Sequence, residues 1–377
     1  MHLRLYLTSL NPTDSVTRGF LPAAKALGWE ITVLTDHPES YAGYETIHAD
    51  VRDPKTVIDV IARHHAPDVI FSNSDHLQVE TALAADYFGL PGKDWRACLT
   101  AKNKALTRRA LGDVRSARLV PGEPLPEVTF PVVVKPREGV ASEDVVLVRE
   151  DLRAAADDIW SRRPGAVLVA EEYLDGPLMT LETLGDGTST TILGGFRTTL
   201  GPLPHFVEER LDWAPDLPGA DLVKAQLDAL GIGFGACHTE YVLTEEGPRI
   251  VEVNYRVIGD NCDLLMADHL DVPLFEWILR VHAGERVPRV PHASGHAATI
   301  SVLATRSGTI MKAPTELTGS YEDVRLWHLP LKEAGQPVAV THTNRDYLAL
   351  LRAIGPDRDA VDTAAKAFLD AHPWVVA

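Results

Sequence analysis

The chain has 377 residues, enough for two or three domains of ordinary size. Apolar residues make up 45% of it and charged residues 24%, which is typical of globular proteins and unlike disordered, collagen-like or coiled-coil chains. The formal net charge of −17 argues against nonspecific nucleic-acid binding and against docking on an anionic membrane. It does not exclude an anionic ligand, because a few lysines in a cleft can outweigh a distant acidic surface.

The three cysteines, Cys98, Cys237 and Cys262, are an odd number without metal-like spacing. Neither a disulfide framework nor a zinc site is therefore predicted. The N-terminal segment lacks the long apolar core of a signal peptide, and no apolar run approaches the ~18 residues of a membrane span. We expect a cytoplasmic protein with no membrane partner.

The first hundred residues alternate between segments typical of strands and of helices. Strands are expected at 3–7, 30–34 and 68–71, and helices at 17–28, 55–64 and 77–88. This alternation implies a parallel sheet with right-handed crossovers. Segment 8–12 lacks the G-x-G-x-x-G fingerprint whose glycines let a backbone approach a pyrophosphate. That absence disfavours a Rossmann oxidoreductase, and we interpret the region as a scaffold.

The rest of the chain is divided by clusters of prolines. A basic helix is expected at 98–113, before prolines that mark a boundary between 121 and 131. Further strands are expected at 132–134, 166–169 and 296–304, with a strand-rich stretch at 176–207 and a hairpin at 236–254. Further helices are expected at 222–230, 345–354 and 360–372.

The hairpin carries an unusual set of polar side chains. If its strands pair about a centre near Glu246, Glu240 lies opposite Glu252. Because side chains alternate along a strand, Asn254 and then Arg256 share the face of Glu252. Opposed carboxylates repel unless a cation lies between them, and carboxylate and amide oxygens suit Mg²⁺ better than zinc. The alternative is an ordinary solvated hairpin face.

Two lysines precede this hairpin in the sequence. Lys135 ends an apolar strand and faces a loop of small residues with Gly139 and Ser142, which can hold phosphate by charge and backbone N–H groups. Lys104 and Arg108 share one helix face by their spacing. The alternatives are a rim lysine before a surface loop and a solvated basic face.

A third segment, 167–173, is a strand that runs into Glu171 and Glu172. Its end could pair with the edge of an adenine through backbone groups. The alternative is a plain edge strand.

These segments, in this order, resemble the ATP-grasp superfamily across nearly the whole chain. The segments that carry the resemblance are Lys104 with Arg108, Lys135 with its loop, 171–176, 238–240 and 252–260. The resemblance implies an α/β chain of the α+β ATP-grasp type. Its Rossmann-like parallel-sheet domain would span 1–97, its linker helix and lid subdomain 98–175, and its antiparallel catalytic subdomain with a β-rich C-terminal extension 176–377.

Within the superfamily the chain is most similar to carboxylate–amine ligases of the amino-acid or dipeptide type. That likeness implies a ligase that forms an amide through an acyl phosphate and releases ADP and phosphate, with a peptide-like natural product as the product. Its partners would be a small carboxylate and an amine, and it could form a homodimer. A biotin-carboxylase-like carboxylase and a nucleotide-binding protein without turnover stay open as alternatives.

The resemblance also implies roles for individual residues. Those for nucleotide binding are Lys104, Lys135, Ser142, Glu171, Glu172, Tyr173, Leu174 and Glu182. Glu182 is included because Leu178 stands where family members often carry the acid that holds ribose. Glu240, Glu252 and Asn254 would hold two Mg²⁺ ions, which Mn²⁺ could replace. Arg256 and Lys135 would be catalytic, and the candidates for contacting substrate are Arg197, His205, Glu208, His238 and Asp260.

Overall fold

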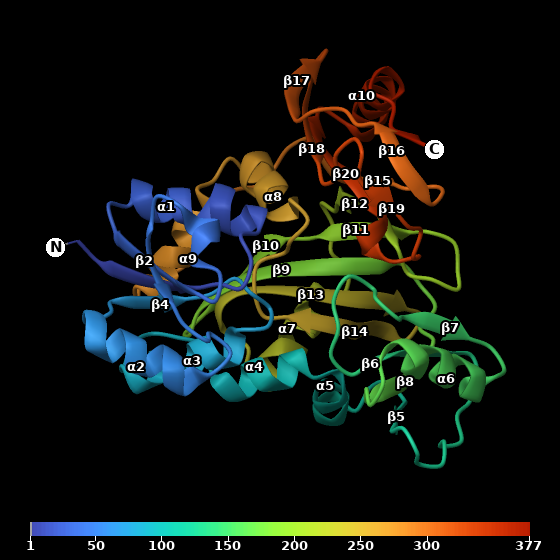
Figure 1. Cartoon of the computed structure of the whole chain (residues 1–377), viewed down its shortest axis with the longest axis horizontal. Coiled ribbons are helices and arrows are strands. Elements are labelled where there is room, and N and C mark those ends of the chain that lie inside the picture. The colour runs from blue at the N-terminus through green and yellow to red at the C-terminus, as the bar shows by residue number, and fades with distance from the viewer. Residues whose placement is uncertain (1) are drawn as a thin grey trace.

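The computed structural model describes residues 2–377. A parallel sheet in the order β3-β2-β1-β4 forms the N-terminal part, with helices on both faces (Figure 1). Its elements are β1 (Arg4–Thr8), β2 (Glu30–Thr35), β3 (Glu45–His48), β4 (Val69–Phe71), α1 (Leu21–Ala26), α2 (Pro54–His64) and α3 (Gln78–Tyr87). The predicted Rossmann-like sheet is confirmed, although β3 had no clear sequence signal.

The expected basic helix at 98–113 is wrong, because the chain forms two helices there. They are α4 (Trp95–Lys102) and α5 (Lys104–Leu111). Asn103 between them is extended, and its side chain accepts hydrogen bonds from the N–H groups of Ala105 and Leu106. It is thus the N-cap of α5, a role that asparagine prefers to a helix interior.

A small antiparallel sheet in the order β5-β8-β6-β7 follows, covered by one helix. Its elements are β5 (Ser116–Leu119), β6 (Val132–Pro136), β7 (Val146–Val148), β8 (Leu168–Glu172) and α6 (Leu152–Arg162). Valines of β6 pack with leucines of α6 and β8 in a core of their own. Figure 1 shows this unit as a separate lobe beside the hairpin of β13 and β14.

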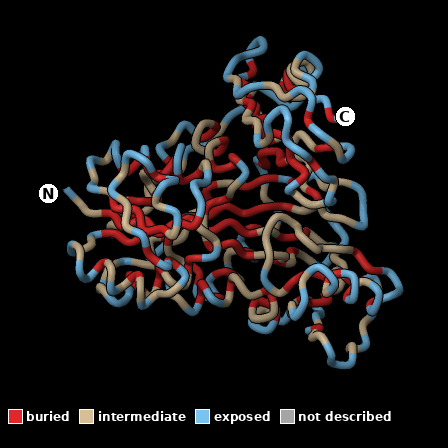
Figure 2. The backbone as a smooth tube through the Cα atoms, in the orientation of Figure 1, coloured by how far each residue is buried: buried red, intermediate tan, exposed pale blue. Residues whose placement is uncertain are grey.

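The larger C-terminal part is built on a long antiparallel sheet in the order β14-β13-β9-β11-β12-β15-β20-β18-β17, with β10 beside β9. Its strands are β9 (Leu178–Asp186), β10 (Thr190–Gly194), β11 (Phe196–Leu200), β12 (Glu208–Trp213), β13 (Phe234–Thr244), β14 (Gly247–Asn254), β15 (His296–Leu303), β17 (Leu317–Tyr321), β18 (Val324–Pro330) and β20 (Tyr347–Gly355). The buried backbone runs through its middle strands (Figure 2).

The expected helix at 345–354 is also wrong, since this segment is strand β20 between β15 and β18. The strand is buried on both faces from Tyr347 to Ile354. A strand covered on both sides reads as a continuous apolar run, and periodicity cannot distinguish such a run from a buried helix. The helix expected at 360–372 is confirmed as α10 (Arg358–Ala371).

The remaining elements are three further helices and a small C-terminal sheet. They are α7 (Ala220–Ala229), α8 (Cys262–Leu270), α9 (Leu274–His282), β16 (Gly308–Lys312), β19 (Pro337–Val338) and β21 (Val375–Val376). Helix α9 contacts both the N-terminal sheet and the long sheet, and the ring of its Phe275 packs on Phe20 with 5.0 Å between centroids. A Cβ at Gly19 would lie 2.3 Å from that ring, so this close approach requires glycine.

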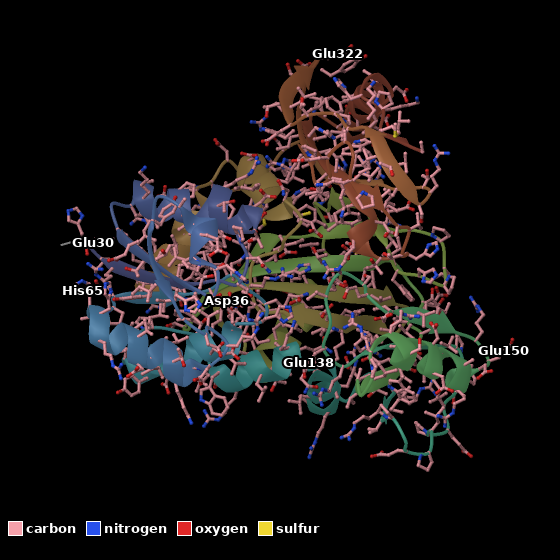
Figure 3. All side chains as sticks on the ribbon, in the orientation of Figure 1. Glu30, Asp36, His65, Glu138, Glu150 and Glu322 are labelled. Atoms are coloured by element: carbon pink, nitrogen blue, oxygen red, sulfur yellow. The ribbon has the colours of Figure 1, made fainter. Side chains whose placement is uncertain are left out.

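The acidic surplus lies largely on the periphery. Glu30, Glu150 and Glu322 are exposed and point outward from three different regions (Figure 3). Over residues 2–377, no helix is both long enough and apolar enough to span a membrane.

Candidate active site

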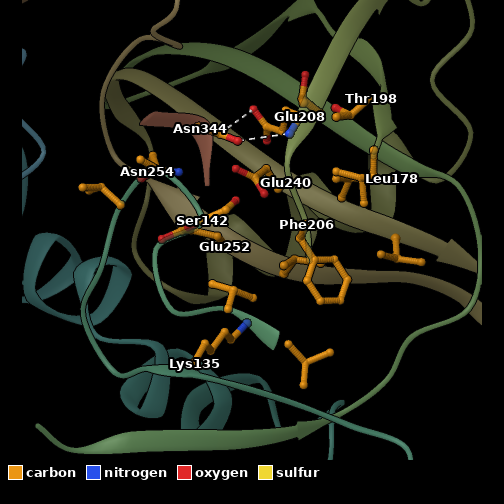
Figure 4. A pocket seen from close by; sticks show the side chains of 18 of the residues that line it. Lys135, Ser142, Leu178, Thr198, Phe206, Glu208, Glu240, Glu252, Asn254 and Asn344 are labelled. Carbon is orange, nitrogen blue, oxygen red and sulfur yellow. Dashed lines mark hydrogen bonds between the residues drawn. The ribbon is translucent and has the colours of Figure 1, made fainter. Parts of the chain in front are cut away.

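A cavity of about 660 Å³ opens where α5, the small sheet and the long sheet meet. Nearly all residues singled out in the sequence line it: Lys104, Lys135, Ser142, Glu171, Glu172, Tyr173, Leu174, Arg197, Glu208, His238, Glu240, Glu252, Asn254, Arg256 and Asp260. In Figure 4, Lys135 lies at one end, Glu208 at the other, and Glu240 between them. Glu182 and His205 are not part of the cavity wall.

The two hairpin carboxylates face each other as the sequence predicted. Glu240 of β13 is paired with Glu252 of β14, and His238 with Asn254. The register shifts between the Glu240 and Tyr241 pairs, so that Val251 is an extra residue in β14. This bulge keeps Glu252 on the cavity side.

Lys104 approaches the same hairpin from α5. Its ammonium group forms an ion pair with Glu252, and both side chains are largely shielded from solvent. Burial by itself would lower the pKa of Lys104, but the Glu252 carboxylate outweighs it and the pKa is raised. A permanent positive charge therefore stands beside one of the two opposed carboxylates.

A buried charge cluster closes the end of the cavity next to the small sheet. Glu171 accepts hydrogen bonds from Arg108 at 2.8 and 3.0 Å, and the ammonium of Lys135 lies 2.7 Å from Oε2 of the same carboxylate. All three side chains are at most 5% exposed. Although burial opposes ionisation, Lys135 and Arg108 lower the pKa of Glu171 to about 2. The carboxylate is therefore ionised and held by two cations.

This arrangement differs from the expectation that Glu171 faces an adenine. Strand β8 is not an edge strand, because β5 and β6 pair with it on its two sides. The N–H of Glu172 donates to Arg115 and the N–H of Tyr173 donates to Pro131. Backbone groups without a strand partner thus begin after Tyr173, at Leu174.

His238 of β13 lines the cavity between two carboxylates. Its Nδ1 is 2.8 Å from Glu182 and its Nε2 is 3.5 Å from Glu240. Despite complete burial, these two carboxylates raise the pKa of His238 to about 10, so the imidazole carries a charge at neutral pH. Glu182 was expected to hold ribose; it shares a strand face with the cavity-lining Leu178 and Thr180, but its carboxylate is bonded to His238 and is not part of the cavity wall.

Of the other candidates for contacting substrate, some line the cavity and one does not. The ring of His205 stacks on that of His342, 4.5 Å away, and is not part of the cavity wall. Arg197 of β11 and Asp260 line the cavity. Asp260 has a left-handed backbone, with φ of 51°, and burial raises its pKa.

Glu208 is held by a residue that the sequence did not indicate. Asn344 accepts a hydrogen bond from the Glu208 N–H at 3.0 Å and donates one to its carboxylate at 3.3 Å (Figure 4). Burial, followed by repulsion from Glu240 and Asp260, raises the pKa of Glu208 to about 8. Asn344 precedes β20, the strand expected to be a helix, so no local pattern could identify it.

The hairpin oxygens fit a divalent cation. Glu240, Glu252 and Asn254 supply hard oxygen donors from paired strands. Across residues 2–377 there is no group of three or more His, Cys, Asp or Glu side chains arranged to hold an ion. Two carboxylates and an amide oxygen are compatible with Mg²⁺, which usually takes one or two protein carboxylates and completes its shell with water and substrate phosphates.

Comparison with known proteins extends these observations. No protein-family model matches the sequence. The uncharacterized protein y4rH of Sinorhizobium fredii is 28% identical over 324 residues, which are 77% of this chain and 64% of that protein. A phosphoribosylamine–glycine ligase of Phenylobacterium zucineum is 27% identical over 306 residues, which are 73% of this chain and 64% of the ligase. The chain thus spans slightly less than two thirds of these relatives.

Among solved structures, the L-amino acid ligase from Bacillus licheniformis superposes with a TM-score of 0.79. The superposition covers 100% of this chain and 98% of that ligase, at 19% sequence identity. The fold of that ligase therefore accounts for the whole chain. The chain shares its fold with an L-amino acid ligase, and a phosphoribosylamine–glycine ligase is among the proteins that it resembles in sequence.

Proposed function

We propose that the protein is an ATP-dependent carboxylate–amine ligase that forms an amide through an acyl phosphate and releases ADP and phosphate. One observation carries the proposal. The opposed carboxylates Glu240 and Glu252 share a cavity with Lys104, Lys135 and Arg256, which is the charge pattern that a metal-bound triphosphate requires.

The proposed nucleotide site uses the end of the cavity at the small sheet. Lys104, Lys135 and Ser142 would contact the phosphates, and backbone groups from Leu174 onward would contact adenine. Glu240, Glu252 and Asn254 would hold the Mg²⁺ ions, which supply charge neutralisation at the phosphate oxygens. Mn²⁺ has the same ligand preferences and would substitute.

The proposed reaction has two steps. A substrate carboxylate oxygen attacks the γ-phosphorus, the β–γ bond breaks, and ADP leaves an acyl phosphate behind. The amine nitrogen then attacks the acyl carbon, loses a proton, and displaces phosphate. Arg256 would neutralise charge on the transferred phosphoryl group, and positioning with charge neutralisation supplies most of the rate in such transfers.

Two structural features support protection of the acyl phosphate from water. The loop at 139–143 lines the cavity, and β7 beside it touches the segment before Glu208 through a hydrogen bond from Leu147 to Pro204. A loop in this position can exclude water from a reactive intermediate. We propose that 98–175 acts as the lid, with 1–97 as scaffold and 176–377 as the catalytic part.

We propose amino acids or small peptides as the substrate class, and a peptide-like natural product as the product. The support is the likeness in fold to an L-amino acid ligase together with the acidic side chain of Glu208 at the end of the cavity away from Lys135, and that of Asp260, which lines the cavity and acts on Glu208. Carboxylates there would suit a substrate ammonium group. We expect a homodimer as the assembly.

The test is an assay of phosphate and ADP over pooled L-amino acids, hydroxy acids and bicarbonate, with Mg²⁺. The proposal expects ADP and phosphate only when a carboxylate and an amine are both present. AMP and pyrophosphate would refute the acyl-phosphate route, because they indicate adenylation. Turnover with bicarbonate alone would indicate a carboxylase, and no turnover in any pool would indicate a nucleotide-binding protein.

A further inference from the structure

We propose that Asn344 is a positioning residue that sets the Glu208 carboxyl at the substrate end of the cavity only when the loop at 139–143 covers the nucleotide end. The inference deepens the proposed ligase function and rests on it. It assigns a role to a segment of the C-terminal part that carries no sequence motif. Two sets of contacts and the backbone conformation of the loop support it.

The first set fixes the orientation of the Asn344 amide. Its oxygen accepts the N–H of Glu208 at 3.0 Å, so its NH₂ group must face the carboxylate, to which it donates at 3.3 Å. Both bonds reach the same residue, and the hydroxyl of Tyr347 donates to the Glu208 carbonyl at 2.7 Å. Glu208 is therefore held by backbone and side chain from one short segment.

The second set joins that segment to the loop. The N–H of Asn344 donates to the carbonyl of Ala141 at 3.0 Å, and the next residue, Arg345, forms an ion pair with Glu143. Glu143 is also 2.6 Å from Arg163 of the small sheet's lobe. Asn344 thus contacts the loop through its backbone and Glu208 through its side chain.

The third observation concerns the loop itself. Ala141 and Ser142 have left-handed backbones, with φ of 58° and 53°, which non-glycine residues adopt only when surrounding contacts support them. The carbonyl of Ala141 is the one that receives the Asn344 N–H. Movement of the loop away from the cavity would break both the Asn344–Ala141 hydrogen bond and the Glu143–Arg345 ion pair. The segment around Asn344 would then have neither of these contacts with the loop.

The consequence is an ordered assembly of the site. Nucleotide that closes the loop would also fix Glu208, so the second substrate would bind better after ATP. Because coupling between two ligands is reciprocal, the second substrate would also tighten nucleotide binding by the same factor.

Hydrogen exchange tests this coupling without turnover. The probe is AMPPNP with Mg²⁺, and the readout is exchange at the Glu208 amide, whose N–H is bonded to Asn344, and across 139–147. In the unmodified protein, AMPPNP should slow both about tenfold or more. In Asn344→Ala, AMPPNP should slow hydrogen exchange across 139–147, but exchange at the Glu208 amide should stay fast. Asn11→Ala, an exposed asparagine in the N-terminal part, is the matched control and should behave like the unmodified protein.

The outcomes separate the two proposals. Slowing of 139–147 with no change at the Glu208 amide in the unmodified protein would overturn the coupling and leave the ligase proposal standing. An equal response in Asn344→Ala would overturn the role of the Asn344 side chain. No slowing anywhere would show that the nucleotide does not bind, and both proposals would then fall.

A kinetic double-mutant cycle gives an independent test once the substrates are known from the pooled assay. Asn344→Ala and Arg345→Met should each raise KM for the substrate at the Glu208 end about tenfold at saturating ATP, but change the Kd of AMPPNP measured without that substrate less than about twofold. If both act on one coupling, the double variant should be no worse than either single variant. Additive effects, or a tenfold rise in the Kd of AMPPNP measured without the substrate, would contradict the inference.

Discussion

Glu240 and Glu252 lie opposite each other because β14 contains one residue more than β13 between the turn and this pair. From Thr244–Gly247 to Tyr241–Ile250 the strands pair residue by residue, and the next pair skips Val251. Without the extra residue, Val251 would oppose Glu240 and Glu252 would point to the other face, since side chains alternate. The extra residue Val251 in β14 thus determines whether the Glu240 and Glu252 side chains lie on the same face.

Arg108 forms hydrogen bonds with the backbone of β14 at the extra residue. Its guanidinium donates to the carbonyl of Ile250 and, at 3.0 Å, to that of Val251, while it also holds Glu171. We predict that Arg108→Met lowers the free energy of unfolding by about 3–5 kcal/mol, because it leaves part of a buried ion cluster uncompensated. It should also weaken Mg²⁺-dependent binding of AMPPNP. Urea unfolding and calorimetric titration measure the two effects.

Arg109→Met is the matched control, since Arg109 neighbours Arg108 but is exposed. Arg109→Met should change neither the free energy of unfolding nor the Mg²⁺-dependent binding of AMPPNP. Binding of AMPPNP by Arg108→Met with the affinity of the unmodified protein would contradict a role for Arg108 in setting the register.

The proposed chemistry makes a second prediction. Glu252→Gln and Arg256→Ala should each abolish ADP release in the pooled assay, because the first removes a charged metal ligand and the second removes the cation at the transferred phosphoryl group. Both variants should stay folded by circular dichroism. Glu246→Gln, in the exposed turn of the same hairpin, should keep full activity. Near-normal turnover in both active-site variants would disprove the assignment.

Adjacent acids in β8 offer a third prediction with its own control. Glu171 is buried between two cations, whereas Glu172 pairs with Arg115, whose side chain is 72% exposed. Glu171→Gln should cost about 3–5 kcal/mol of stability, and Glu172→Gln less than about 1 kcal/mol. The pKa of Glu171 is lowered to about 2, so its contribution is complete above its unfolded pKa of 4.5 and is lost as pH falls toward 2.

Chemical denaturation between pH 3 and 7 measures both effects. Stability of Glu171→Gln should depend less on pH below 4.5 than that of the unmodified protein. Equal losses in the two variants at pH 7 would contradict the burial argument.

Because His282 is buried, we predict that the folded protein loses stability at mildly acidic pH. Its ring is 4% exposed and packs between Phe71 and Phe234, and its two nitrogens have no hydrogen-bond partner within residues 2–377. Burial, together with nearby Lys93, lowers its pKa to about 3. The unfolded chain binds the proton more readily, so stability should fall as pH decreases from 6.5, by about 2 kcal/mol at pH 5 from this residue.

His282→Leu should remove that part of the pH dependence while keeping the apolar packing. His65→Leu, at an exposed position, is the control and should leave the slope unchanged. The comparison is the difference in unfolding free energy between pH 7 and pH 5. An unchanged slope in His282→Leu would refute the prediction.

The elements that the sequence predicted correctly have local causes. The alternating strands and helices before residue 90 follow from periodicity and from residues that end helices, such as Gly28. The hairpin carboxylates were also predicted to face each other, but from a turn centre that the structure places elsewhere. The extra residue Val251 compensated for that difference, so the agreement at Glu240 depends on a feature that no sequence pattern showed.

By itself, the sequence determined the order of elements in the N-terminal sheet and which short segments bear charge, because spacing along the chain is enough for both. The tertiary structure decided what those charges contact. Glu171 is neutralised by Arg108 and Lys135, Glu182 turns to His238, and the segment before β20 brings Asn344 to Glu208, 136 residues away along the chain. Such pairings depend on which distant segments share a core, and burial then determines which side chains stay charged.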